Sequence, residues 1–147
     1  MERNPGRSIA SIFRKSQLYW NQALKEADIG AAESPILLLL YRGDGRTQEE
    51  ITQEVGVDKS AIARAVQALE TKGFLARRKD EADRRCNRIY LTEKAESYRE
   101  AAEAAKLQWN TILQNHMSEE EQEMLSRLLQ TAAANAKEWS DYEYRKE

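Results

Sequence analysis

The chain contains few of the residues that build disulfides, metal clusters and tight loops. Its 147 residues include one cysteine, one histidine, two prolines and six glycines. A single cysteine, Cys86, cannot form an internal disulfide, so we expect a reducing, cytoplasmic environment. One histidine without clustered cysteines argues against a metal site, and we expect neither a metal nor another cofactor.

Long apolar runs are also missing. The longest, Pro35 to Tyr41, falls well short of the roughly 20 residues that a membrane-spanning helix needs. The first eight residues are polar, and no secretory apolar segment follows them. No nucleophile–base pair or phosphate-binding loop can be identified. We therefore expect neither a membrane protein nor an enzyme.

The apolar residues that are present recur mostly at helical spacing. Hydrophobic residues make up 41% of the chain, enough for one mainly helical domain over residues 1–147. Helices are predicted from Ser8 to Ala27, about Ala31 to Tyr41, Thr47 to Val55, Asp58 to Lys72, Thr92 to about His116, and Ser118 to about residue 144. The helix after Thr92 is expected to be the longest.

Local signals fix several of these boundaries. Thr47 with Glu50, and Ser118 with Glu121, fit the capping-box pattern, and Asp58 is a natural N-cap. Gly73 can adopt the left-handed conformation that closes a helix. The start of the second helix stays open, because it could begin near Gly30 or use Ser34-Pro35 as its cap and first turn. Its apolar run is also compatible with a strand, although its leucines favour a helix.

A basic hairpin follows the helix that begins at Asp58. Short strands at Phe74-Leu75 and Ile89-Leu91 flank residues 77–88, which carry six basic and three acidic side chains. Helix, turn at Gly56, helix and hairpin together predict a winged helix-turn-helix, which is a mainly α fold with a small β-hairpin wing. We expect this core to occupy residues 30–92.

The positive charge is concentrated in the same part of the chain. The net charge is −2, but residues 58–88 carry nine basic and five acidic side chains. Local excess charge attracts a polyanion even when the whole chain is slightly acidic, so double-stranded DNA is the expected partner. A solvated surface helix and a solvated charged turn are the alternatives when each element is considered alone. Their combination favours DNA binding.

Two groups of side chains would contact the DNA. Lys59, Ser60, Ala61 and Arg64 lie outside the apolar stripe of their helix, and an arginine there can bind guanine in the major groove. An arginine at the hairpin tip can enter the minor groove. Asp83 is close enough in sequence to orient Arg85.

These motifs resemble those of the multiple-antibiotic-resistance regulator (MarR) family. Asp83-Arg84-Arg85 followed by Leu91-Thr92 is similar to the family's wing signature, and residues 56–60 and 69–74 resemble the start and end of its recognition helix. The resemblance implies a homodimeric regulator, most often a repressor, that binds a pseudo-palindromic operator. The DNA-binding residues would be Gln48, Lys59, Ser60, Ala61, Arg64, Arg77, Arg84, Arg85 and Arg88, with Asp83 orienting the wing arginine.

The terminal helices, residues 8–27 and 93–144, would form the dimer. Their apolar stripes exceed what the winged core can cover. The family resemblance also implies release from DNA by a small aromatic or phenolic effector bound between the dimer helices and the winged core. Tyr19, Trp20, Tyr41 and Tyr98 could line that site, or could simply be core or dimer contacts.

Two further hypotheses remain open from the sequence. The winged module could serve as a protein–protein adapter that does not read DNA. Cys86 could be oxidisable because of the neighbouring arginines, although a small residue at a tolerant turn position is the simpler interpretation. The chain departs from the family's peroxide-sensing branch, which has its reactive cysteine in the first helix.

Overall fold

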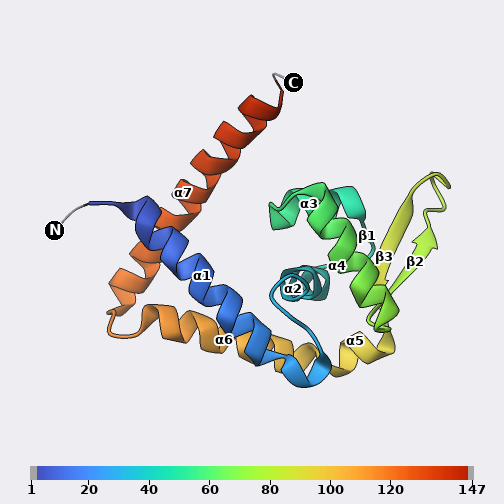
Figure 1. The fold of residues 1–147 in the computed structure, drawn as a ribbon, viewed down its shortest axis with the longest axis horizontal. Coiled ribbons are helices and arrows are strands. Elements are labelled where there is room, and N and C mark those ends of the chain that lie inside the picture. The colour runs from blue at the N-terminus through green and yellow to red at the C-terminus, as the bar shows by residue number, and fades with distance from the viewer. Residues whose placement is uncertain (1–2, 146–147) are drawn as a thin grey trace. The chain divides into compact units, whose positions relative to one another are not determined.

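The computed structural model describes residues 3–145 and confirms a mainly helical, winged helix-turn-helix fold (Figure 1). The elements are α1 (Pro5–Ala23), η1 (Lys25–Ala27), α2 (Ser34–Arg42), β1 (Arg46–Thr47), α3 (Gln48–Val55), α4 (Lys59–Thr71), β2 (Leu75–Lys79), β3 (Asn87–Leu91), α5 (Glu93–Ser97), α6 (Arg99–Gln114) and α7 (Glu119–Tyr144). The chain divides into two compact units, one ending at Trp109 and the other beginning at Asn110, within α6.

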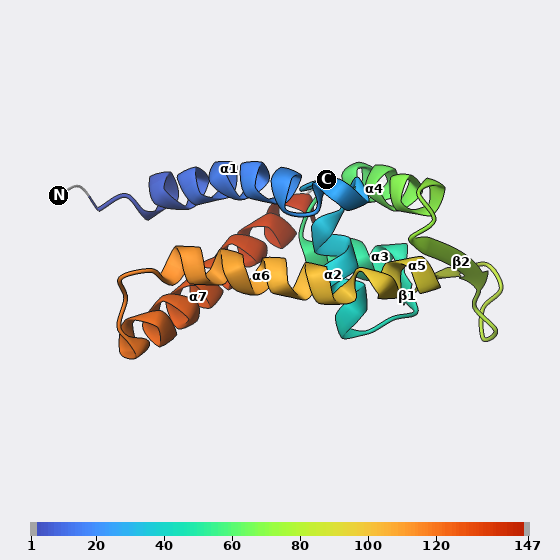
Figure 2. The same ribbon diagram turned by 90° about the horizontal axis from the view of Figure 1, so that it is seen from below.

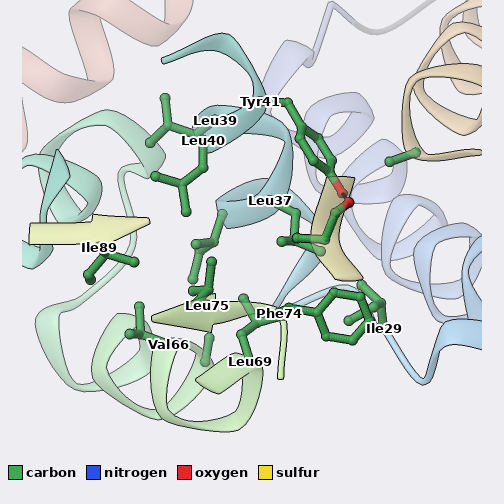
Figure 3. Close-up of a cluster of buried hydrophobic side chains, with 14 of the residues drawn as sticks. Ile29, Leu37, Leu39, Leu40, Tyr41, Val66, Leu69, Phe74, Leu75 and Ile89 are labelled. Carbon is green, nitrogen blue, oxygen red and sulfur yellow. Dashed lines mark hydrogen bonds between the residues drawn. The ribbon is translucent and has the colours of Figure 1, made fainter. Parts of the chain in front are cut away.

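The hydrophobic core of the first unit is built around α2. Figure 3 shows Leu37 and Leu40 of α2 together with Val66 and Leu69 of α4, and with side chains from the sheet. The helix presents buried residues on most sides, which explains its nearly unbroken apolar sequence. The expected helix over this run is therefore confirmed, and the strand alternative is wrong.

The wing is part of a small antiparallel sheet with the strand order β1-β3-β2. Leu75 lies opposite Leu91, and Lys79 lies opposite Asn87. The strands thus extend further into the basic hairpin than the sequence predicts, and Phe74 precedes β2 instead of starting it. Strand β1 was not predicted, because two residues are too short to show an alternating pattern.

The predicted helix caps are confirmed. Thr47 and Ser118 each accept a hydrogen bond from the amide three residues ahead, and both capping boxes are complete. The Asp58 carboxylate accepts from the Ala61 amide at 2.8 Å. Gly73, just beyond α4, has a φ of 83°, in the left-handed region that favours glycine. The ends of the helix-turn-helix are therefore determined by local chemistry.

The predicted helix from Ser8 to Ala27 differs at both ends. It begins at Pro5, where the Asn4 side chain caps the Arg7 amide, and it ends at Ala23. Leu24 forms a bridge to Ile29, and both side chains are buried. The chain reverses between these two buried side chains through the short helix η1. The second helix begins at Ser34, whose hydroxyl donates to the Gly30 carbonyl, so Ser34 is not the N-cap.

The predicted continuous helix from Thr92 to His116 is wrong. Thr92 caps only α5, Tyr98 interrupts the helix, and α6 then runs to Gln114. The Tyr98 ring packs against Phe74 with ring centres 5.6 Å apart, a tertiary contact that local spacing cannot indicate. Among the described residues the longest helix is α7, with 26 residues.

Tyr41 ties α2 to the helices that follow the wing. Its buried hydroxyl donates to the Ala95 carbonyl at 2.6 Å, and the Arg99 guanidinium donates to the Tyr41 carbonyl at 2.8 Å while lying over the ring. Burial, followed by the nearby Glu96 carboxylate, raises the pKa of Tyr41 to about 12.

We predict that Tyr41→Phe lowers the free energy of unfolding by about 0.5–1.5 kcal/mol at neutral pH, because the buried Ala95 carbonyl keeps the Tyr98 amide as a donor but loses the Tyr41 hydroxyl. Wild-type stability should also fall as the pH rises from about 10, the pKa of an unfolded tyrosine, towards about 12. The variant should lack this part of the alkaline loss. Urea unfolding across this pH range checks both effects, and equal alkaline slopes would contradict the assignment.

Candidate nucleic-acid interface

The exposed face of α4 carries the residues that the sequence predicts for the major groove. Lys59, Ser60 and Arg64 are exposed and Ala61 is half-buried, while the opposite face of the helix is in the core. Gln67 is also exposed, and it follows Ser60 and Arg64 at helical steps of four and three. Gln67 is not among the residues predicted from the sequence, although its spacing places it on the same face of the helix. A glutamine amide can hydrogen-bond adenine.

Helix α3 precedes the turn at Gly56 and packs against α4, and its first turn offers a second candidate contact to DNA. Gln48 is the first residue of α3 and is half-buried. The N-terminal amides of a helix favour a phosphate, so this end of α3 is chemically suited to contact a DNA backbone. Gly56 has a φ of 75°, which allows the short turn between the two helices.

The tip of the wing presents one arginine that is both exposed and oriented. The Arg85 side chain is 91% exposed, yet its Nε lies 3.1 Å from Oδ1 of Asp83 and its second guanidinium nitrogen 3.4 Å from Oδ2. The Arg85 backbone amide also donates to Asp83. These hydrogen bonds, from the Arg85 side chain first, lower the pKa of Asp83. The predicted contact between the two residues is confirmed, so Asp83 restricts the directions that Arg85 can take.

The arms of the wing hold the remaining basic residues in different ways. Arg84 is exposed. Nε of Arg77 lies 2.5 Å from a carboxylate oxygen of Glu70, at the end of α4. The Arg78 guanidinium lies 5.0 Å from the centre of the Tyr90 ring. Arg88 lies at the base of the wing, where it contacts the Asp80 carboxylate and the Gly45 carbonyl. Arg77 therefore connects the wing to α4, and Arg88 connects it to the turn at Gly45.

Cys86 is exposed next to the same turn. Its sulfur lies 3.8 Å from Oδ2 of Asp83, within the range of a weak hydrogen bond. Its backbone carbonyl accepts from the Asp80 amide and its amide donates to the Asp83 carbonyl. The thiol thus contacts a carboxylate, and the redox hypothesis remains a prediction.

The four aromatic residues predicted for an effector site are engaged in packing. Tyr19 stacks on Trp109 with ring centres 5.0 Å apart, meets Trp20 edge-on and donates to the Ala105 carbonyl. Tyr41 and Tyr98 make the core contacts described above. A groove of about 490 Å³ lies elsewhere in the first unit, lined by Pro35, Leu38, Leu39, Arg42, Glu54, Val55 and Lys106. None of the four aromatic residues lines it.

Residues 3–145 show neither a metal site nor a membrane-spanning helix. No group of three or more His, Cys, Asp or Glu side chains in this range is placed to hold a metal ion. No helix in the same range is long and apolar enough to cross a bilayer.

Comparison with known proteins agrees with this arrangement. Residues 27–85 match the model of the MarR family. The HTH-type transcriptional regulator BilQ of Clostridium symbiosum is 30% identical over 121 residues, which cover 82% of this chain and 84% of BilQ. An uncharacterised HTH-type transcriptional regulator of Bacillus subtilis, YybA, is 26% identical over 94% of this chain and 91% of its own length.

Solved structures give the same result. A MarR transcriptional regulator from Methanosarcina mazei Go1 shares 30% identity and superposes with a TM-score of 0.84, over 90% of this chain and 96% of that one. The transcriptional regulator SlyA shares 27% identity with a TM-score of 0.88, over 92% and 95% of the two chains. These relatives are transcription regulators and not enzymes. The chain belongs to the MarR family of DNA-binding transcriptional regulators.

Proposed function

We propose that this regulator is a homodimeric repressor that binds a pseudo-palindromic operator in the cytoplasm. The observation that best supports the proposal is Arg85, which is almost fully exposed at the end of the hairpin yet held by Asp83. It belongs to the same compact unit as the exposed face of α4. Two DNA-reading elements on one rigid body can enter neighbouring grooves together.

Each contact has a distinct role in this proposal. Lys59, Ser60, Ala61 and Arg64 face the major groove, where Arg64 reads base edges and the Lys59 ammonium contacts a phosphate beside the groove. Arg85 enters the minor groove, where a narrow, electronegative channel attracts its charge. Gln48 and the first amides of α3 contact the phosphate backbone. Asp83 limits the rotamers of Arg85, so less conformational entropy is lost on binding.

Exposed apolar side chains support the dimer. On α1 they are Ile9, Ile12, Phe13 and Leu18, and on α7 they are Met124, Leu128, Leu129 and Trp139. Apolar surface of this kind at helical spacing is typical of an interface. A two-fold axis through the terminal helices would duplicate α4, and two copies about 34–36 Å apart would enter successive major grooves.

The groove beside α2 is the proposed effector site. It combines the apolar side chains of Leu38, Leu39 and Val55 with two cations, Arg42 and Lys106, against one carboxylate, Glu54. That combination suits a small aromatic acid or phenolate, which needs apolar contact for its ring and a positive partner for its charge. An effector that binds better to a dimer with a different spacing of α4 would shift the population away from DNA.

The central prediction concerns the intact, purified chain. Selection from random duplexes should enrich two inverted half-sites about 10–10.5 base pairs apart. Sedimentation should give a dimer, and some members of a panel of aromatic acids should release the selected duplex. A monomer at working concentrations, or no enrichment of any duplex in dilute buffer, would refute the proposal. A protein–protein adapter would also lack the steep loss of DNA affinity that rising salt should cause.

The wing is tested by removing charges of opposite sign. Arg85→Ala should weaken binding to the selected duplex about tenfold or more, because a minor-groove contact is lost. Asp83→Asn should also weaken binding, although it removes a negative charge close to the DNA. Glu81→Gln, an equal charge change at an exposed wing position, is the control and should bind at least as tightly as the wild type. Tighter binding by Asp83→Asn in fluorescence-anisotropy titrations would exclude an orienting role.

Base reading by α4 is tested at one position. Arg64→Ala should cost roughly 1–3 kcal/mol at the half-site position that it reads, and should relax the base preference there. Lys59→Ala is the comparison, since an ammonium that contacts phosphate should weaken all sequences alike. Titrations against single-base variants of the selected duplex separate the two. A uniform loss for Arg64→Ala would make Arg64 a phosphate contact.

A further inference from the structure

Arg88 occupies a special place in the wing. The wing strand β3 is the central strand of the sheet (Figure 1). On this strand, Arg88 is paired with Thr47 of β1 on one side and with Arg78 of β2 on the other. Its side chain is 35% exposed, against 91% for Arg85 at the tip. The sequence places both among the predicted DNA contacts, but their surroundings differ.

The guanidinium of Arg88 makes contacts on two sides. Its Nε donates to Oδ2 of Asp80 at 2.9 Å, on the wing. One terminal nitrogen donates to the Gly45 carbonyl at 2.7 Å and lies 3.9 Å from a carboxylate oxygen of Glu50, at the start of the helix-turn-helix. A rigid, planar fork can satisfy such divergent acceptors at once.

On one side, these contacts reach the turn before β1 and the first turn of α3. The Glu50 oxygen that faces Arg88 also accepts from the Thr47 amide and so completes the cap of α3. Gly45 has a φ of 72°, and its amide donates to the Ile89 carbonyl of β3. Arg88 therefore contacts the turn before β1, the two-residue strand that leads into α3.

At the other end, Asp80 organises the loop that carries the DNA-reading arginine. Its carboxylate accepts from the Ala82 amide at 2.9 Å, and its own amide donates to the Cys86 carbonyl. The Ala82 amide, and after it the Arg88 side chain, lower the pKa of Asp80. The side chain of Asp80 is 16% exposed. Asp80 thus links the base of the wing to the loop that contains Asp83 and Arg85.

We propose that Arg88 is a positioning residue, which bridges Asp80 of the wing to the turn before α3 and so fixes the direction in which Arg85 projects relative to α4. Its charge faces the carboxylates of Asp80 and Glu50, and its Nε and one terminal nitrogen donate to acceptors within the protein. It acts on DNA binding through geometry, and not by contacting phosphate. The inference builds on the DNA-binding role proposed above for Arg85.

The two possible roles of Arg88 predict opposite effects of Asp80→Asn. If Arg88 contacts phosphate, removing the neighbouring carboxylate frees a cation and lowers the local negative charge, so affinity should rise. If Arg88 is a positioning residue, the same change breaks the bridge and affinity should fall. We expect a loss of about tenfold for the selected duplex, with Glu81→Gln as the matched control that does not lose affinity.

Arg88→Lys provides an independent test. A lysine keeps the positive charge and would preserve a phosphate contact, but a single ammonium cannot reproduce the fork between Asp80 and Gly45. We expect Arg88→Lys to lose affinity about as much as Asp80→Asn, and the double variant to lose no more than either single variant. Arg84→Gln, which removes an exposed wing cation, should instead reduce the salt dependence of binding by about one phosphate contact.

Hydrogen exchange of the free protein tests the bridge without DNA. The wing amides of Asp80 and Cys86, both hydrogen-bonded in the structure, should exchange faster in Asp80→Asn and in Arg88→Lys, while amides of the core helices keep wild-type rates. Thermal melting confirms that each variant is folded.

The outcomes separate this inference from the proposed function. Faster wing exchange supports the bridge even if the wild-type protein binds no duplex, which would refute only the proposed function. Unchanged wing exchange in both variants would overturn the bridge. Tighter DNA binding by Asp80→Asn, or wild-type affinity in Arg88→Lys, would overturn the positioning role and make Arg88 a DNA contact.

Discussion

The burial of Phe74 is the interaction on which the rest of the structure depends. This residue directly follows Gly73, just beyond α4, and directly precedes β2, so it joins α4 to the wing. Its ring is fully buried, its amide donates to the Leu69 carbonyl, and its carbonyl accepts from the Thr92 amide. Burying such a side chain contributes about 1.5–3 kcal/mol. The burial of Phe74 therefore holds α4 and the wing in a fixed relative position.

Because α4 and the wing are fixed to one another, the exposed charges on them also have fixed relative positions. The net charge of −2 would by itself suggest little affinity for DNA. Within the wing, however, acidic residues hold arginines in place without covering them completely. Asp83 orients Arg85 at the tip, and Asp80 anchors Arg88 at the base. The wing therefore keeps a positive electrostatic potential while its carboxylates restrict the rotamers of the arginines that carry the charge.

The local boundaries could be predicted because they depend on adjacent residues. The capping boxes at Thr47 and Ser118, and the left-handed glycine after α4, satisfy hydrogen-bonding and conformational needs within a few positions of the chain. The interruption at Tyr98 could not be predicted in this way. The tyrosine packs on Phe74, which lies 24 positions earlier, while the apolar spacing on either side of it continues through the break.

The sequence by itself determined the helix-turn-helix, the basic wing and the pairing of Asp83 with Arg85, because each depends on spacing over a few residues. Only the tertiary structure decided which arginines point outward and which are used inside the fold. Arg85 and Arg88 lie three positions apart in one basic segment and are chemically identical. Their difference arises from Gly45 and Glu50, distant residues that the folding of β1 against β3 brings beside Arg88.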